Sequence, residues 1–137
     1  MTINSIYIVD DDLITIFGLK KILGRIPMDI PIKEFHNGKD ALDAIELQRI
    51  QGIPLPSVIF LDINMPVMDG WTFLEKFMAM NIDTKIRIKI ITSSIDVSDR
   101  KKWEYFCNKA SFQIDFITKP IYDLQLNDLL VGMEMAS

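Results

Sequence analysis

The chain of 137 residues carries 49% hydrophobic and 25% charged residues, a balance that fills and covers the core of one compact domain. Its net charge of −4 supplies no basic field for a nucleic acid, and its single cysteine, Cys107, cannot form an internal disulfide. Because the sequence shows neither a leader segment nor an apolar run of about 18 residues, we expect a cytoplasmic protein that binds neither a membrane nor a nucleic acid.

Short apolar runs alternate with longer segments of helical spacing along the chain. The runs predict strands at residues 5–9, 30–35, 57–61, 87–92 and 113–118. The other segments predict helices at 13–25, 38–48, 69–80, 98–109 and 123–134, with a surface loop at 48–56. This alternation predicts an α/β fold of the (βα)5 type, in which residues 1–137 form a single domain.

The strands differ in how apolar they are, and this difference indicates their order in the sheet. The runs IYIV at 6–9 and VIFL at 58–61 are apolar throughout, as parallel strands covered by helices on both faces require. The run at 30–35 alternates and contains Pro31, which has no N–H for a ladder, so we place it at an edge. Right-handed crossovers then predict a flavodoxin-like, doubly wound, five-stranded parallel sheet of order 2-1-3-4-5.

Polar side chains stand at the carboxyl ends of four predicted strands, where open parallel sheets collect their ligands. They are Asp10, Asp11 and Asp12 after the first strand, Asp62 after the third, Thr92, Ser93 and Ser94 at the end of the fourth, and Lys119 after the fifth. Taken singly, each has an ordinary explanation: Asp12 and Asp69 stand where helix caps are expected, and the others suit strand ends or solvated surface positions. A shared site explains why all of them fall at one edge.

Three carboxylates at one edge indicate a bound cation. Two like charges about 4 Å apart repel by roughly 4 kcal/mol at an effective dielectric of 20, so Asp10, Asp11 and Asp62 must raise their pKa values or bind a metal. Oxygen ligands without a His or Cys cluster favour Mg²⁺, with Mn²⁺ as a substitute, and Mg²⁺ favours sites shared with phosphate. Lys119 and the Thr92 hydroxyl suit a phosphoryl group, and a carboxylate is able to accept one as an aspartyl phosphate.

Four motifs carry a family resemblance that spans nearly the whole chain. IYIVDDD, FLDINMPVMDG, IITSS and FITKP, in this order and spacing, resemble the receiver domain of bacterial two-component response regulators. The resemblance implies that Asp62 accepts a phosphoryl group from a sensor histidine kinase or a phosphotransfer protein. It also implies that Mg²⁺ is held by Asp10, Asp11, Asp62 and the backbone carbonyl of Asn64. Such a protein is a phosphoacceptor and not an enzyme that acts on other substrates.

The same resemblance assigns a conformational switch to the other motifs. Thr92, with Ser93 beside it, and Lys119 would contact the phosphoryl group, and Phe116 would follow the Thr92 hydroxyl inward on activation. Phe lacks the polar tip of the Tyr or His often found at this position, which would bias the switch. The remaining assignments are a cis peptide bond between Lys119 and Pro120 and a tuning of dephosphorylation by Asn64 and Ser94.

The length of the chain suggests how such a signal would be passed on. Residue 137 lies about where the fifth helix should end, so we expect a stand-alone receiver without an output domain. Its output would be protein contact through the face formed by 98–109, 113–118 and 123–134, with a phosphorylation-dependent homodimer as one form. On the fourth helix we expect Trp103, Phe106 and Ala110 to face the sheet and Lys102, Tyr105 and Lys109 to face outward, as either an output face or an ordinary solvated one.

Two other classes of protein fit parts of this pattern. A phosphorylation-independent binding module could keep the fold and lose the chemistry, but none of the expected site residues is missing. A Mg²⁺-dependent phosphatase of the α/β type would also form an aspartyl phosphate. Such enzymes carry a second acid two residues after the nucleophile, where this chain has Asn64, and they need a cap for which the chain has little spare length.

Overall fold

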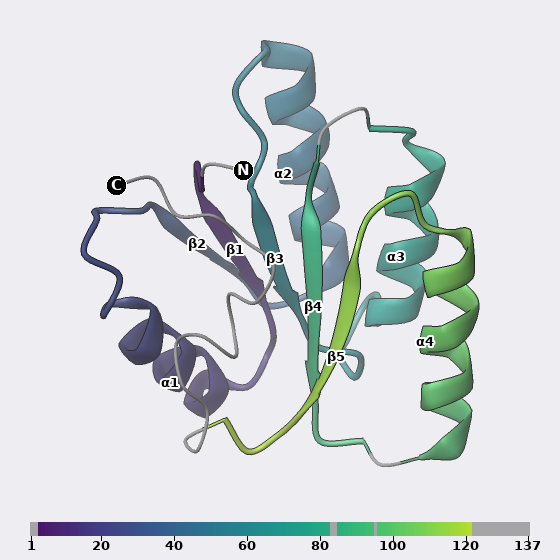
Figure 1. Ribbon diagram of the computed structural model, residues 1–137. Helices are drawn as coiled ribbons and strands as arrows, with labels where there is room; N and C mark the ends of the chain where they lie inside the picture. The colour runs from purple at the N-terminus through teal and green to yellow at the C-terminus, as the bar shows by residue number, and fades with distance from the viewer. Residues whose placement is uncertain (1–2, 83–84, 95, 122–137) are drawn as a thin grey trace.

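One parallel sheet of five strands organises the protein, with the strand order β2-β1-β3-β4-β5 that the sequence predicted (Figure 1). The structure is a computed structural model that describes residues 3–82, 85–94 and 96–121. The strands are β1 (Ile6–Val9), β2 (Ile32–Phe35), β3 (Val58–Leu61), β4 (Arg87–Thr92) and β5 (Ile114–Thr118). Ile6 of β1 pairs with Ile32 of β2 on one side and with Val58 of β3 on the other. Val58 in turn pairs with Arg87 of β4, so both β1 and β3 have a neighbour on each side.

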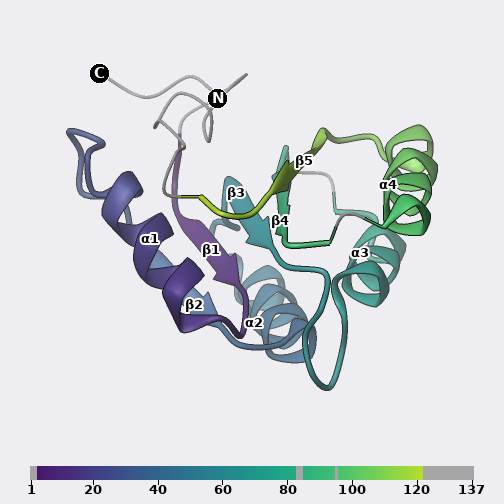
Figure 2. The same ribbon diagram turned by 90° about the horizontal axis from the view of Figure 1, so that it is seen from below.

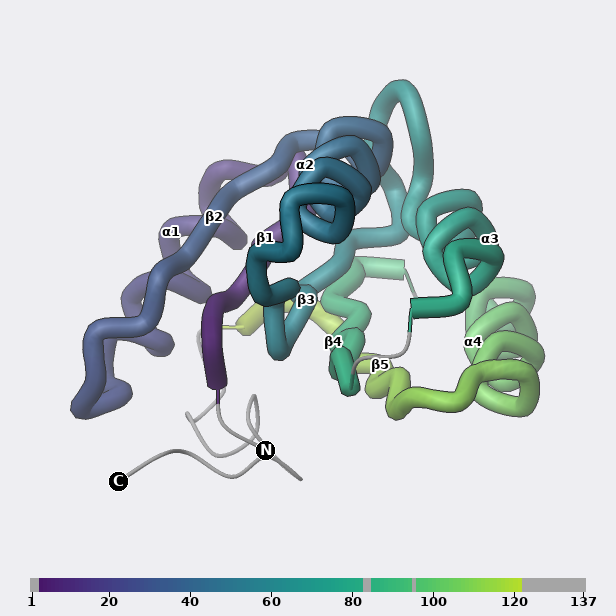
Figure 3. Tube along the Cα trace, turned by 90° about the horizontal axis from the view of Figure 1, so that it is seen from above, coloured from purple at the N-terminus to yellow at the C-terminus, as the bar shows by residue number. Residues whose placement is uncertain are grey.

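Helices connect the strands and cover both faces of the sheet. They are α1 (Leu13–Leu23), α2 (Gly38–Gln51), α3 (Gly70–Ala79) and α4 (Val97–Lys109). Figures 2 and 3 show α1 on one face, with α2, α3 and α4 side by side on the other. The predicted helix at 123–134 lies outside the described residues. Within the part of the chain that is described, no helix has the length and apolar character needed to cross a bilayer.

Burial on both faces explains why the central strands are apolar throughout. On β1, Tyr7 and Val9 pack into the core under α2, α3 and α4, whereas Ile6 and Ile8 pack into the core under α1. All four side chains are completely buried. Burying a large apolar side chain contributes about 1.5–3 kcal/mol, so these short strands are held mainly by side-chain packing on their two faces.

An acid or amide side chain fixes the start of each described helix. Asp12, Asn37, Asp69 and Asp96 stand before α1, α2, α3 and α4, and each accepts a hydrogen bond from a backbone N–H of the first turn. Caps of this kind typically stabilise a helix by about 1 kcal/mol. The predicted caps at Asp12 and Asp69 are therefore confirmed.

The end of α2 lies three residues later than predicted, at Gln51, so the loop expected at 48–56 begins only at Gly52. The last turn leaves Ile50 exposed, and an exposed turn gives no apolar periodicity to follow. Gly52 ends the helix with a φ of 69°, a left-handed conformation that glycine adopts without a steric penalty.

The outer edge of the sheet at β2 is short and charged, as the edge position predicted from Pro31 suggests. β2 has four residues, of which Lys33 and Glu34 are exposed. The carbonyl of Pro31 accepts a hydrogen bond from the N–H of Ile6 at 2.9 Å, so the proline joins the sheet only through its acceptor. The Glu34 carboxylate also forms an ion pair of 2.6 Å with Lys20 of α1, which ties the helix to this edge.

Candidate functional site

The two central strands deliver buried carboxylates to the same edge of the sheet. Asp10 follows β1 and Asp62 follows β3, and their side chains are largely buried, with residue exposures of 2% and 5%. Both residues continue the ladders, because the Asp10 N–H donates to the carbonyl of Phe35 and the Asp62 N–H to that of Val9, each at 2.9 Å. The apolar strands therefore fix the backbone of both acids.

Asp10, Asp11 and Asp62 form an acidic triad that fits a divalent-metal site. One oxygen from each carboxylate lies within 4.8 Å of the other two, and Asp11 is the exposed member that leaves the triad accessible from solvent. Carboxylate oxygens are hard ligands of the kind that Mg²⁺ and Mn²⁺ prefer. The Asn64 residue lies at the surface beyond Asp62, with its side chain exposed.

Lys119 stands among three carboxylates at this edge. Its Nζ lies 3.4 Å from Oδ2 of Asp10, 3.6 Å from Oδ2 of Asp12 and 3.7 Å from Oδ2 of Asp62. Its backbone N–H donates to the carbonyl of Thr92 at 2.7 Å, so the end of β5 is held against the end of β4. The peptide bond between Lys119 and Pro120 is cis, the form implied by the resemblance.

Burial and like charges shift the pKa values of this cluster. Burial raises the pKa of Asp10 to about 7, with the Asp62 carboxylate adding to the effect and Lys119 opposing it. Burial also raises the pKa of Asp62, against the opposing charge of Lys119. For Lys119, burial acts to lower the pKa, but the carboxylates of Asp10 and Asp62 outweigh it and leave the pKa above its ordinary value. One ammonium therefore does not balance the surrounding acids, which favours recruitment of a further cation.

The hydroxyl residues at the end of β4 and directly after it differ in their surroundings. Thr92 is completely buried, and its Oγ1 accepts a hydrogen bond of 3.1 Å from the N–H of Ser94. Ser93 between them is exposed. Thr92 therefore lies close to Lys119, whose backbone N–H donates to the Thr92 carbonyl. Ser93, in contrast, faces solvent.

Phe116 lies away from the acidic triad, on the β5 side that packs against α4. Its half-buried ring is 5.8 Å from the ring of Trp103, and the Arg100 guanidinium lies 5.0 Å from the Phe116 ring centre. On α4, Trp103 and Phe106, together with Ala110 directly after the helix, are the less exposed positions. Lys102, Tyr105 and Lys109 are exposed, as predicted for the two faces of this helix.

The turn after Asp62 is tight enough to require glycine at position 70. The N–H of Gly70 donates to the carbonyl of Ile63 at 2.8 Å, and a Cβ on Gly70 would lie 2.4 Å from the carbonyl oxygen of Asp62. No side chain larger than hydrogen fits at that distance without a backbone shift. Gly70 therefore allows α3 to begin directly against the residue that carries the buried carboxylate.

Two acidic residues at this edge of the sheet make contacts that the sequence did not predict. Asp12 was predicted only as a helix cap, yet it also faces Lys119. Asp99 was not singled out, yet its carboxylate accepts hydrogen bonds from the Trp71 indole and the Ser94 hydroxyl. Both acids stand at the start of helices, where a cap or a favourable interaction with the helix dipole explains an acid without any further partner.

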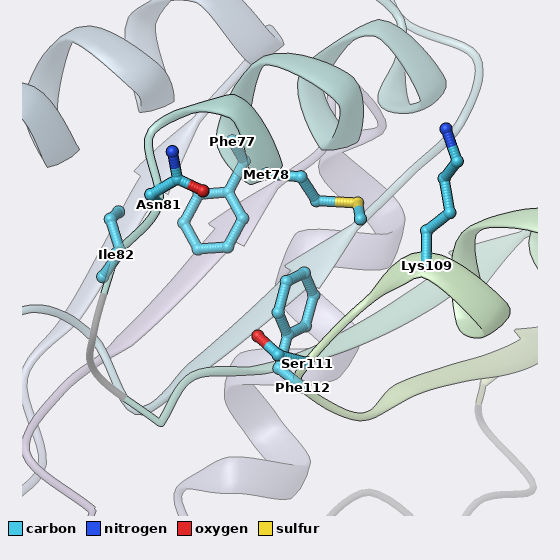
Figure 4. Close-up of a pocket in the computed structure, with 7 residues that line it drawn as sticks. All are labelled: Phe77, Met78, Asn81, Ile82, Lys109, Ser111 and Phe112. Atoms are coloured by element: carbon cyan, nitrogen blue, oxygen red, sulfur yellow. The ribbon is translucent and has the colours of Figure 1, made fainter.

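A hollow at the other end of the sheet contains none of the predicted site residues. Figure 4 shows Phe77 and Met78 at the end of α3 and Phe112 in the connection between α4 and β5, which line a cavity of about 130 Å³. Because the helices run opposite to the strands, the ends of α3 and α4 lie at the edge where the strands begin. The cavity is thus remote from the acidic triad.

The fold and the triad agree with the comparison with known protein families. The response regulator receiver domain family matches residues 6–131, and this chain belongs to that family. It is a receiver domain with an acidic pocket formed by Asp10, Asp11 and Asp62.

The individual similarities are to a longer curated protein and to solved structures of response regulators. A protein-glutamate methylesterase/protein-glutamine glutaminase of Treponema pallidum is 33% identical over 120 residues, which are 85% of this chain and 26% of that protein. The chain thus spans about a quarter of the length of this curated relative. A two-component response regulator from Cytophaga hutchinsonii superposes with a TM-score of 0.73 at 26% identity, covering 94% of this chain and 95% of that one. The Mn²⁺-bound form of response regulator Rcp1 has the same fold, with a TM-score of 0.69 at 23% identity over 92% of this chain and 86% of that chain.

Proposed function

We propose that Asp62 accepts a phosphoryl group from a sensor histidine kinase or a phosphotransfer protein, and that residues 1–137 act as one cytoplasmic receiver domain. The observation that carries this proposal is the ammonium of Lys119, 3.7 Å from a carboxylate that is almost completely buried. A carboxylate is a nucleophile for phosphoryl transfer, and an adjacent ammonium binds the transferred oxygens. A new bond forms between an Asp62 oxygen and phosphorus while the bond from phosphorus to the donor nitrogen breaks.

Mg²⁺ is the metal that we propose for the triad, with Asp10, Asp11, Asp62 and the backbone carbonyl of Asn64 as its protein ligands. When bound, the ion supplies positive charge against the phosphoryl oxygens. Mn²⁺ would substitute, which is in keeping with the Mn²⁺-bound form of Rcp1. Asp10 and Asp11 hold the metal, Lys119 binds a phosphoryl oxygen, and the buried Thr92 hydroxyl and the N–H of Ser93 donate to the others.

The response that we propose is a movement of Thr92 toward the phosphoryl group, followed by Phe116. The ring of Phe116, on β5, packs against the ring of Trp103, on α4, so a change in the position of the Phe116 ring would alter the outward surface of α4 and β5. We propose that the surface of α4 and β5 binds a downstream protein or a second phosphorylated copy; the segment 123–134, which was expected to share in this face, lies outside the described residues. Ser94 and Asn64 are the residues that we propose to tune the rate of hydrolysis.

The bond type tests the proposed function directly. Wild-type protein incubated with Mg²⁺ and radiolabelled acetyl phosphate is expected to gain one phosphoryl group that hydroxylamine releases, because hydroxylamine cleaves acyl phosphates and leaves phosphoserine and phosphothreonine intact. Mass spectrometry counts the groups. A chain that stays unlabelled at every metal concentration would instead support the phosphorylation-independent binding module.

An apolar surface beside the site favours a protein as the phosphoryl donor. Leu13, Ile14 and Phe17 on the first turns of α1 have exposures of 66%, 83% and 71%. They directly follow Asp12, whose carboxylate faces Lys119, so the apolar surface adjoins the acidic cluster. Exposed apolar residues that cluster are typical of protein interfaces.

Phe17→Glu is expected to slow phosphoryl transfer from a protein donor by about tenfold or more, because burying an unpaired charge in an interface is costly. The same variant should take up phosphoryl groups from acetyl phosphate at the wild-type rate. Ile50→Glu is the matched control, since Ile50 is 73% exposed but lies at the end of α2, at the opposite edge of the sheet. Transfer is measured from a purified phosphotransfer protein that labels the wild type. Equal effects of the two variants would refute a docking role for α1.

A further inference from the structure

The carboxylate of Asp99 joins α3 to the loop between β4 and α4. Asp99 lies in the first turn of α4, and its Oδ1 accepts a hydrogen bond of 3.0 Å from Nε1 of Trp71 on α3. Its Oδ2 accepts a hydrogen bond of 2.5 Å from the hydroxyl of Ser94 in the loop. Both oxygens of one acid are therefore used to connect two segments that the sheet does not connect directly.

The connection continues from Ser94 to the buried hydroxyl of Thr92. The N–H of Ser94 donates to Thr92 Oγ1 at 3.1 Å, while the Ser94 Oγ accepts a weaker hydrogen bond of 3.3 Å from the N–H of Asp96. Ser94 thus holds Thr92 through its backbone and is itself held by Asp99 through its side chain. A chain of hydrogen bonds runs from Trp71 through Asp99 and Ser94 to Thr92.

Trp71, where this series of hydrogen bonds begins on α3, is firmly held in place. Trp71 is buried, and its ring stacks on the ring of Phe106 from α4 with centres 5.6 Å apart and planes 4° from parallel. The Ser94 hydroxyl holds the pKa of Asp99 below its ordinary value, with burial opposing and the Trp71 indole adding to the effect, so the carboxylate is charged at neutral pH. Hydrogen bonds to a charged group are about twice as strong as those between neutral groups.

We propose that Asp99 is a positioning residue that holds the β4–α4 loop, and with it the Thr92 hydroxyl, in the arrangement of the unphosphorylated protein. The inference rests on the proposed function of Asp62. For Thr92 and the following amides to approach a phosphoryl group, Ser94 must release Asp99 or draw the start of α4 with it. Asp99 therefore sets part of the free-energy cost of switching, although it lies outside the acidic cluster.

An ordinary role of Asp99 in helix stability predicts a different behaviour. An acid in the first turn interacts favourably with the helix dipole, and its loss would lower the stability of α4 without affecting the phosphoryl site. Asp96 offers the comparison, because its carboxylate caps the same helix through the N–H of Ser98 at 3.0 Å. The Asp96 side chain takes no part in the three hydrogen bonds that link Trp71, Asp99, Ser94 and Thr92.

The test is a titration of the full chain with beryllofluoride, a stable mimic of an aspartyl phosphate, in the presence of Mg²⁺. We expect Asp99→Ala to bind beryllofluoride about tenfold more tightly than wild type, the factor that corresponds to one hydrogen bond to a charged group. The affinity of Asp99→Asn should lie between those of Asp99→Ala and wild type, because the asparagine oxygen still accepts a hydrogen bond from Trp71 and its amide group can donate one to the Ser94 oxygen. Asp96→Ala should bind as wild type does, despite its lost cap.

The indole N–H signal of Trp71 in a ¹H–¹⁵N spectrum gives an independent readout. We expect it to shift when wild type binds beryllofluoride, because Asp99 loses Ser94 as a second donor; Trp71→Phe identifies the signal. The inference would be overturned if Asp99→Ala and wild type bound beryllofluoride with equal affinity, or if Asp96→Ala bound it as much more tightly as Asp99→Ala does. A Trp71 signal that does not move on binding would overturn it as well. Wild type that binds no beryllofluoride would refute the proposed function itself, and therefore also the inference that rests on it.

Discussion

Asp62→Asn is expected to abolish labelling by a small phosphoryl donor, whereas Asp69→Asn in the same loop is expected to leave labelling unchanged. The two acids belong to one motif but have different surroundings. Asp62 is 5% exposed and faces the Lys119 ammonium, and an amide in its place has no anionic oxygen to attack phosphorus. Asp69 is exposed and accepts a hydrogen bond of 2.8 Å from the N–H of Thr72, a capping role that asparagine fills equally well.

The measurement is the hydroxylamine-sensitive label on each purified variant, with thermal unfolding to show that both are folded. Loss of label in Asp62→Asn should exceed about a hundredfold, since a nucleophile is removed and not merely misplaced. A label that persists in Asp62→Asn, or one that disappears equally in Asp69→Asn, would show that Asp62 is not the acceptor.

In metal-free buffer, the stability of the protein should fall as the pH rises from about 4 to about 7, because the pKa of Asp10 is raised by burial. Below pH 4 the carboxyl is protonated in both the folded and the unfolded chain, and its favourable contribution to folding is fully present. Between its ordinary pKa of 3.8 and its folded value of about 7, only the unfolded chain loses the proton, so the contribution is lost. The part of the loss due to Asp10 should be on the order of 2–4 kcal/mol. Asp10→Asn should remove this part and leave a smaller loss from Asp62, whose pKa burial also raises.

Saturating Mg²⁺ should reverse this loss at neutral pH. At a concentration of about 100 times the dissociation constant, a ligand stabilises the folded state by about 2.7 kcal/mol, which corresponds to a rise in Tm of roughly 5–10 °C for a chain of this size. Asp11→Asn should reduce the rise, since Asp11 belongs to the triad. Asp12→Asn is the matched control, because the neighbouring acid caps α1 and asparagine retains the cap.

Scanning calorimetry with and without EDTA follows both effects. A wild-type Tm that ignores Mg²⁺, or a rise that Asp12→Asn reduces as much as Asp11→Asn does, would contradict a metal site at the triad. If stability depends on pH in the same way in Asp10→Asn as in wild type, a group other than Asp10 causes the loss of stability.

The sheet and the acidic triad could be predicted because both depend on local patterns. The runs at 6–9 and 58–61 are apolar at every position, a pattern typical of parallel strands that are covered on both faces. The residue that follows such a strand lies at the carboxyl edge of the sheet. Asp10 and Asp62 were therefore placed together without any knowledge of their contacts. The last turn of α2 was missed because Ile50 is exposed and gives no apolar repeat.

Contacts between distant helices could not be predicted in the same way. Trp71 and Asp99 are 28 residues apart, and their hydrogen bond depends on how α3 and α4 pack on the sheet. In the sequence, Trp71 has the appearance of an ordinary core residue and Asp99 that of an ordinary first-turn acid. The pairing of Asp12 with Lys119 was hidden for the same reason, since the cap alone accounts for an acid at that position.

The guarded edge at β2 bears on how copies of this protein can assemble. A strand from another molecule would have to add beside a strand of only four residues, next to Pro31 and the exposed charges of Lys33 and Glu34. Short length, proline and charge at an edge are the features by which proteins discourage intermolecular strand pairing. Growth of the sheet from one molecule to the next is thereby hindered at this side. At this side of the sheet, a contact between two copies would have to be made by side chains and not by bare backbone.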